Sequence, residues 1–183
     1  MTPQARTLTP KGEARRIALM DAVLRVLETQ GPGGVTHRAV AAEAGVPLAA
    51  ATYYFATIDD LLVDALTRAT AQQTDLFSSL TERDIPAFAR MLYAYTHTNR
   101  ASAIAQYELL FLAMRRDSLR PAAALWYQTL EDAVLAAGLD PDAARVAALA
   151  IDGLLLRMLW NGDPESVSEI ETVLRVILPT RPI

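Results

Sequence analysis

The chain has 183 residues, a hydrophobic content of 52% and a formal net charge of −4. That length is enough for one domain or two small ones with a sizeable core. The absence of cysteine excludes a disulfide framework and a thiolate metal site, as is typical of a protein from a reducing compartment. Long Ala/Leu stretches and almost no alternation of β-branched residues predict an all-α fold.

We expect neither a signal peptide nor a membrane-spanning helix. The apolar run that follows the first basic residues is interrupted by Asp21, and later apolar stretches contain Asp152 and Arg157. These charged side chains break up the apolar runs that a signal peptide or a membrane span needs. The expectation is therefore a cytoplasmic protein that has no membrane partner.

The first residues of the chain predict a flexible arm followed by a helix. Residues 1–12 are polar and contain two prolines. An apolar stripe then predicts a helix over residues 13–30, and the glycine-rich segment 31–34 ends it.

The segment 35–62 has the form of a helix-turn-helix. Thr36 is suited to cap a first short helix, and Gly45 can take the left-handed conformation that ends it. Pro47 suits the start of a second short helix, because its missing N–H would be unpaired there. Residues 57–60 have the spacing of a capping box for the helix that follows. Such a motif places its second helix in the major groove of DNA.

The rest of the chain predicts six further helices, which brings the total to about nine. Proline recurs near the predicted starts and glycine past several of the predicted ends. We expect these helices over residues 59–80, 86–100, 103–116, 121–137, 141–161 and 164–178.

The helix-turn-helix resembles the DNA-binding domain of TetR-family transcriptional regulators. The residues that carry the resemblance are Thr36, Arg38, Ala41, Ala44–Val46, Tyr53–Phe55, Thr57 and Asp60–Leu62. Beyond this segment the chain resembles the family in length and helical character. The resemblance implies a three-helix DNA-binding domain over residues 1–58 and a helical ligand-binding and dimerisation domain over residues 59–183.

The charge distribution agrees with a DNA-binding N-terminal part. Residues 1–58 carry a net charge of +2, whereas residues 59–183 carry −6. A duplex repels the acidic part and so orients the basic part toward itself. Because the basic surplus is small, useful affinity requires a dimer. Four N-terminal cations can reach the DNA backbone or a minor groove: Arg6, Lys11, Arg15 and Arg16.

The family match also assigns the residues that contact double-stranded operator DNA. They are Thr36, Arg38, Pro47, Leu48, Ala49, Ala50, Thr52, Tyr53 and Tyr54. The second motif helix lacks the Arg, Lys, Asn and Gln that pair with base edges, and Ile58 stands where the family usually has a phosphate-binding lysine. We therefore expect modest base discrimination through Arg38, thymine methyl groups and DNA shape, with core packing as the alternative role of Tyr53.

The predicted helix over 141–161 is apolar around too much of its circumference for burial on one side. A symmetric four-helix interface between two subunits provides a second partner, and TetR-like regulators dimerise through their last two long helices. The alternative is that both faces are covered within one subunit. The expected homodimer interface consists of Val146, Leu149, Gly153, Leu156, Ile170, Val173, Leu174 and Ile177.

The middle helices are rich in aromatic and sulfur-containing side chains, which suits either a largely apolar pocket or an ordinary helical core. TetR-like regulators usually bind a small molecule in this part, and the resemblance therefore implies a pocket. Its candidate residues are Tyr93, His97, Tyr107, Phe111, Met114, Trp126, Tyr127 and Met158. The expected effector is small and largely apolar, and its binding releases a repressor from its operator.

Two other classes of function compete with a regulator. Against an enzyme, the two histidines lie 60 positions apart and no nucleophile elbow or phosphate loop is present, so we expect no catalytic site, metal or cofactor. The remaining alternative is a helical adaptor that binds proteins through its acidic part and has no DNA specificity.

Overall fold

The computed structural model describes residues 9–77, 84–164 and 166–178. These residues form nine α-helices and no strand, which confirms the all-α prediction. Three helices make up the N-terminal part: α1 (Pro10–Gln30), α2 (His37–Glu43) and α3 (Leu48–Tyr54). The others are α4 (Ile58–Leu76), α6 (Ile85–Tyr93), α7 (Arg100–Leu112), α8 (Arg120–Ala136), α9 (Pro141–Asn161) and α10 (Val167–Ile177).

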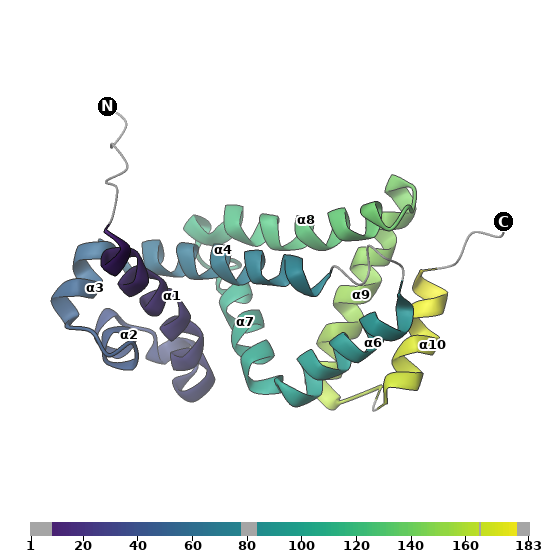
Figure 1. Ribbon diagram of the computed structural model, residues 1–183, viewed down its shortest axis with the longest axis horizontal. Helices are drawn as coiled ribbons and strands as arrows, with labels where there is room; N and C mark the ends of the chain where they lie inside the picture. The colour runs from purple at the N-terminus through teal and green to yellow at the C-terminus, as the bar shows by residue number, and fades with distance from the viewer. Residues whose placement is uncertain (1–8, 78–83, 165, 179–183) are drawn as a thin grey trace.

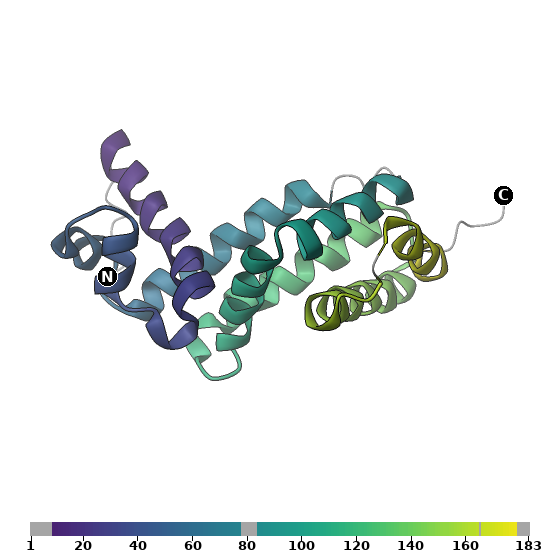
Figure 2. The same cartoon turned by 90° about the horizontal axis from the view of Figure 1, so that it is seen from below.

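The molecule is elongated, with α1, α2 and α3 gathered at one end and α6, α9 and α10 at the other (Figure 1). The long α4 leaves the N-terminal end and runs beside α8 (Figure 1). Seen from below, α9 and α10 lie next to each other, far from α1–α3 (Figure 2). None of the described helices combines the length and the apolar character that crossing a membrane requires.

Helix α1 begins earlier than the sequence predicts. The hydroxyl of Thr9 accepts a hydrogen bond from the N–H of Gly12 at 3.2 Å, so Pro10 occupies the first helical position. The prediction of an arm over residues 1–12 is therefore wrong from Pro10 onward. Residues 1–8 of that predicted arm, which include Arg6, lie outside the described residues.

Two later helix starts also differ from the prediction. The predicted break near residue 100 is present at Asn99, after a π-helical segment η2 (Ala94–Thr98) that continues α6, but α7 begins at Arg100 rather than at residue 103. Helix α10 begins at Val167 instead of Pro164, because Ser166 and Glu169 form a capping box there. The predicted end of α4 at residue 80 falls outside the described residues.

One continuous core runs through both ends of the molecule. On α4, Leu62 and Leu66 are fully buried, and the helix packs against α1 on one side and α8 on the other. Two ion pairs strengthen the contact between α4 and α1: Arg68 with Asp21, and Arg16 with Asp64. Because α4 packs against α1 at the N-terminal end and also against α8, no gap in the core separates two domains there. The domain boundary at residues 58 and 59 stays a prediction.

Candidate DNA-binding surface and ligand cavity

The corner between α2 and α3 has the local geometry that the sequence predicts. The Thr36 hydroxyl accepts a hydrogen bond from the Ala39 N–H at 3.1 Å and caps α2. Gly45 has a φ of +65°, and its N–H donates to the carbonyl of Ala42. The next N–H, from Val46, donates to the carbonyl of Ala41 at 3.0 Å. This pair of hydrogen bonds satisfies the last carbonyls of α2 and sets the direction of α3.

Helix α3 has one buried face and one exposed face. Ala51 is fully buried in the core, and Phe55, directly after the helix, is buried as well. On the opposite face Leu48 is 41% exposed and Tyr53 is 60% exposed. Thr52 is also exposed, and its hydroxyl donates to carbonyls within the same helix. The exposed face thus presents apolar groups and hydroxyls to a partner.

The nine residues assigned to DNA lie together on α2, the corner and α3. Seven of them are exposed, and two are half-buried, namely Ala50 and Tyr54. The rings of Tyr53 and Tyr54 meet edge to face with their centroids 5.2 Å apart. The structure places Tyr53 on the surface rather than in the core, which was its alternative role.

Arg38 is the exposed cation on α2, and it forms no ion pair with any residue that the structure describes. Arg16, in contrast, is ion-paired to Asp64, and its guanidinium lies 5.6 Å from the centroid of the Phe55 ring. This side chain therefore holds α1 against α4, and its contact with DNA stays a prediction.

The start of α4 joins the helix-turn-helix to the rest of the molecule. The Thr57 N–H donates to the Asp60 carboxylate at 2.9 Å and the Asp60 N–H donates to the Thr57 hydroxyl at 3.1 Å, which confirms the predicted capping box. The neighbouring Asp59 accepts hydrogen bonds from Ser118, at 2.7 Å, and from Arg116. The Ser118 bond is the main reason that the pKa of Asp59 lies below its ordinary value, and the Arg116 guanidinium adds to it.

One polar contact at the motif has no signal in the sequence. His37, at the start of α2, has its Nε2 3.0 Å from the carbonyl oxygen of Phe55, which directly follows α3. The contact fixes the end of α3 against the start of α2. Only the packing of these two helices brings the groups together.

The predicted dimer face is exposed on α9 but largely buried on α10. Val146, Leu149 and Gly153 are exposed, and Leu149 reaches 66%. Leu156, Val173 and Ile177 are half-buried. The prediction is wrong for Ile170 and Leu174, because both side chains are fully buried within the subunit, where α10 packs against α6.

The sequence analysis missed two large exposed side chains beside this face. Trp160, near the end of α9, is 84% exposed, and Val176 of α10 is exposed as well. Both fall on the helices that the dimer prediction names. An apolar stripe on its own does not show which of its members a neighbouring helix will cover.

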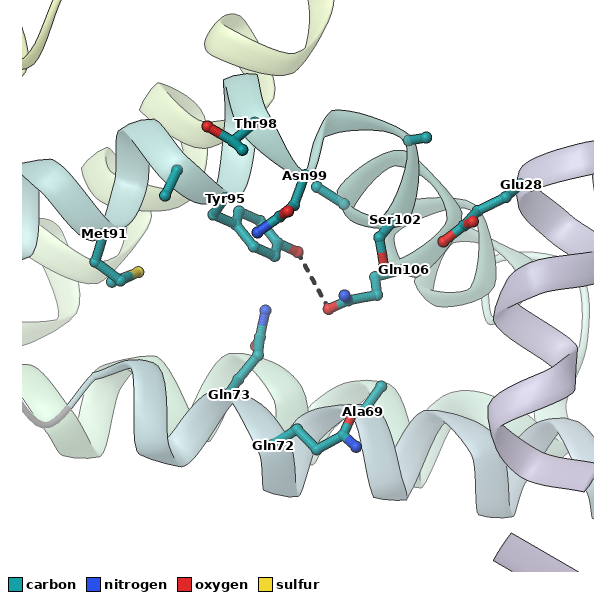
Figure 3. A pocket seen from close by; sticks show the side chains of 13 residues that line it. Glu28, Ala69, Gln72, Gln73, Met91, Tyr95, Thr98, Asn99, Ser102 and Gln106 are labelled. Atoms are coloured by element: carbon teal, nitrogen blue, oxygen red, sulfur yellow. Dashed lines mark hydrogen bonds between the residues drawn. The ribbon is translucent and has the colours of Figure 1, made fainter. Parts of the chain in front are cut away.

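A cavity of about 560 Å³ opens between α4, α6, η2, α7 and the end of α1 (Figure 3). Inside it, the phenol of Tyr95 donates to the Gln106 side-chain oxygen at 3.2 Å, and the amide of Gln73 also hydrogen bonds to Tyr95. Burial raises the pKa of Tyr95 above its ordinary value, so the phenol stays protonated. The wall comprises Glu28, Ala69, Gln72, Gln73, Met91, Ala94, Tyr95, Thr98, Asn99, Ala101, Ser102, Ala103 and Gln106.

None of the eight candidate pocket residues lines this cavity, and their role in ligand binding stays a prediction. Tyr107, Trp126 and Met158 are buried in the core. Tyr93 and His97 stack on each other with ring centroids 4.3 Å apart, and the remaining candidates are exposed on the surface. Those exposed candidates are Phe111, Met114 and Tyr127.

A half-buried carboxylate lies among the aromatic residues that are candidates for the pocket. The phenol of Tyr107 donates to the Asp152 carboxylate at 2.8 Å. Burial raises the pKa of Asp152 above its ordinary value, and the Tyr107 hydrogen bond opposes that rise in part. The site of Asp152 therefore disfavours the ionised form of this carboxyl group.

Two family models match this chain. Residues 19–65 match the model described as bacterial regulatory proteins, tetR family, and residues 83–180 match the tetracyclin repressor-like C-terminal domain. The second match spans more than half of the chain. This chain belongs to the TetR family. TetR-family proteins are DNA-binding transcription factors, so the chain is a transcriptional regulator and not an enzyme.

Two curated transcriptional regulators are similar to this chain, one over most of it and the other over less than half. The HTH-type transcriptional regulator BetI of Rhizobium meliloti (strain 1021) is 29% identical over 84% of this chain and 82% of its own length. PksA of Bacillus subtilis (strain 168), another HTH-type transcriptional regulator, is 36% identical over 40% of this chain and 36% of PksA.

Two solved structures cover nearly the whole fold. The multidrug binding protein EbrR, complexed with ethidium, is 37% identical with a TM-score of 0.77, covering 91% of this chain and 99% of EbrR. The TetR-family member SCO1917 from Streptomyces coelicolor A3 is 37% identical with a TM-score of 0.75, covering 91% of this chain and 99% of SCO1917.

Proposed function

We propose that this TetR-family regulator is a homodimeric repressor whose two α3 helices bind an operator and whose cavity takes the effector that releases it. The observation that carries the proposal is the exposed face of α3 at the end of an elongated molecule, together with Arg38 of α2, which is exposed and forms no ion pair with a described residue. Because a regulator of this kind works on DNA inside the cell, we also propose that it is cytoplasmic.

The chemistry of the α3 face supports recognition of thymine-containing sites. Leu48, Ala49 and Ala50 offer apolar contact to thymine methyl groups, and Thr52 and Tyr53 offer hydroxyls to phosphates or base edges. Arg38 provides the positive charge that α3 lacks. With few base-edge hydrogen bonds available from α3, DNA shape contributes the rest of the discrimination.

The exposed face of α9 supports a homodimer. Val146, Leu149 and Trp160 are large apolar side chains that lie open to water in one subunit. Between them Gly153 stands within a helix, where glycine costs about 1 kcal/mol relative to alanine. Apart from the neighbouring backbone of the same helix, no described residue lies within 4 Å of a Cβ at that position. Close approach of a second α9 accounts for the glycine and covers the apolar side chains.

The cavity supports a small-molecule effector. Its volume falls within the range of about 300–1,000 Å³ that is usual for ligand sites. Its wall mixes small apolar side chains with amides and hydroxyls, so we infer a more polar effector than the aromatic composition predicts. EbrR has been solved with ethidium, proflavin and malachite green, and compounds of this kind are the first candidates. By linkage, DNA weakens effector binding as much as the effector weakens DNA binding.

Selection of bound fragments from a random DNA pool tests the proposal, because it requires no knowledge of the operator. The expected product is a two-fold symmetric sequence with half-sites about 10 base pairs apart or a multiple of that spacing. Small molecules that do not themselves bind DNA are then screened for release of this fragment. The proposal would be contradicted if no sequence were enriched and if the amount of DNA that the protein retains did not depend on the salt concentration. The comparisons give no support to the adaptor alternative.

A further inference from the structure

The cavity includes one residue from the DNA-binding end of the molecule. Glu28 lies in the last turn of α1, whereas the rest of the wall comes from α4, α6, α7 and the segment between α6 and α7. Figure 3 shows its carboxylate pointing from α1 toward the wall that Ser102 and Gln106 form. A molecule in the cavity can therefore contact α1 directly, without an intervening element.

The position of Glu28 is unfavourable for the fold alone. The C-terminal end of a helix carries partial negative charge, so an acidic side chain in the last turn destabilises the helix. Helix α1 has no basic residue in that turn, and Glu28 forms no ion pair with the residues that the structure describes. Arg25, one turn earlier, is already paired with Glu43 of α2 at 2.7 Å. A local rule broken without compensation is typical of a functional position.

The cavity wall as a whole carries a negative charge. Of the thirteen residues that line the cavity, Glu28 is the charged one, and the other polar members are amides and hydroxyls. Gln73 and Tyr95 are both buried, and the Tyr95 phenol donates to the side-chain oxygen of Gln106 at 3.2 Å, which places the phenol and this amide oxygen in the cavity wall. Carboxylate, amide and phenol oxygens together suit a ligand with a positive charge and donor groups.

We propose that the effector of this cavity is an organic cation whose charged group binds Glu28, so that α1 of the DNA-binding end is itself a ligand-contacting helix. This inference rests on the proposed function, in which the cavity takes the effector. Helix α1 is in direct contact with the two helices of the DNA-binding motif. It packs against α2 and α3, and the ion pair between Arg25 and Glu43 joins it to α2. A bound cation thereby links the position of α1 to the occupancy of the cavity.

The test compares two probes that differ in fixed charge, using the full chain without DNA. The probes are ethidium and 3,8-diamino-6-phenylphenanthridine, which has the same ring system without the ethyl group and without the permanent charge. Calorimetry gives the affinity of each probe for the wild type, for Glu28→Gln and for Asp132→Asn. Asp132 is exposed on α8, outside the cavity wall, so its substitution removes the same charge elsewhere.

We expect Glu28→Gln to weaken ethidium roughly two- to fivefold, the range for a partly exposed ion pair, and to leave the neutral probe unchanged. Asp132→Asn should change neither affinity. Hydrogen exchange gives a second measurement, in which ethidium protects the last-turn amides of α1 in the wild type and less so in Glu28→Gln. A bulky Gln72→Trp at the exposed rim should weaken both probes, because it fills the cavity.

Several results would overturn the inference. Equal weakening of both probes by Glu28→Gln, or no effect on ethidium, removes the role of the carboxylate. Unchanged affinities in Gln72→Trp show that the probes bind elsewhere, and failure of the wild type to bind ethidium removes the cation preference. Operator binding is measured separately without any probe, so its persistence in these cases leaves the proposed DNA-binding function standing.

Discussion

Replacing Arg38 with alanine tests how the regulator attaches to DNA. The side chain is exposed on α2 and has no ion-pair partner among the described residues, so its removal should change the free energy of unfolding by no more than about 0.5 kcal/mol. Operator binding should respond far more strongly, because Arg38 is an exposed cation on α2, the helix that precedes α3 in the motif.

The expected size follows from one contact per subunit. A single good contact from arginine contributes roughly 1–3 kcal/mol to binding, and a dimer makes that contact twice. If Arg38 neutralises a phosphate, the slope of log affinity against log salt becomes shallower by about 1 per contact, and hence by about 2 for the dimer.

Fluorescence anisotropy of a labelled operator across a series of KCl concentrations measures both quantities. Arg90→Ala is the matched control, because Arg90 is exposed on α6 and its loss removes the same charge from the other end of the molecule. An Arg38→Ala protein with wild-type affinity and salt slope would refute the reasoning. If Arg90→Ala lost as much operator affinity as Arg38→Ala, the effect would come from the net charge of the protein rather than from a contact with DNA.

Three further changes probe the corner, the dimer face and the buried carboxylate. Gly45→Ala should lower the free energy of unfolding, measured by urea denaturation, by about 1 kcal/mol, because φ at this position is +65° while the space around it is open. A loss above about 3 kcal/mol would indicate a steric clash instead. Leu149→Arg should give a folded monomer by light scattering that has lost most of its operator affinity, and a surviving dimer would move the interface elsewhere. Asp152→Asn should raise the melting temperature at neutral pH. Because the pKa of Asp152 is raised in the folded state, the stability that this residue contributes is present in acid and is lost as the pH rises through the folded-state pKa. Well below the ordinary pKa of aspartate the two proteins should melt alike, and a lower melting temperature for Asp152→Asn at neutral pH would contradict this sign.

Local backbone chemistry made much of the fold predictable from the sequence. Thr36 and Gly45 act within one helical turn of their own positions, so their roles could be deduced without any tertiary structure. The same holds for the box formed by Thr57 and Asp60. Errors arose where two local signals compete, as at Pro164, where a helix start was predicted but the cap at Ser166 begins the helix later.

The cavity could not be predicted because it depends on how distant helices are tilted. Aromatic content directed the prediction to residues such as Tyr107 and Trp126, and these fill the core instead, with ring centroids 6.0 Å apart. The space remains where side chains are short or carry amides, as at Ala103 and Gln73. In a sequence, a glutamine in a helix predicts a solvent-exposed position. Gln73 is buried in the cavity wall because α4 packs near η2 and α7, and this packing cannot be deduced from the sequence.

The dimer prediction failed for a related reason. Ile170 and Leu174 form a clear apolar stripe, yet a stripe does not tell whether its partner lies in the same chain or in another. In this chain α6 covers them. The exposed Trp160 of α9 carried the more informative signal, because a large aromatic side chain open to water needs a partner.

Photo-crosslinking from α3 tests the central claim most directly. A benzophenone amino acid replaces Tyr53 in one protein and Tyr127 in another; Tyr127 is a control because it is exposed on α8, away from α3. With the selected operator, the account predicts a crosslink to DNA from position 53 and none from position 127. Crosslinking from position 127, with none from position 53 in a protein that still binds the operator, would contradict it.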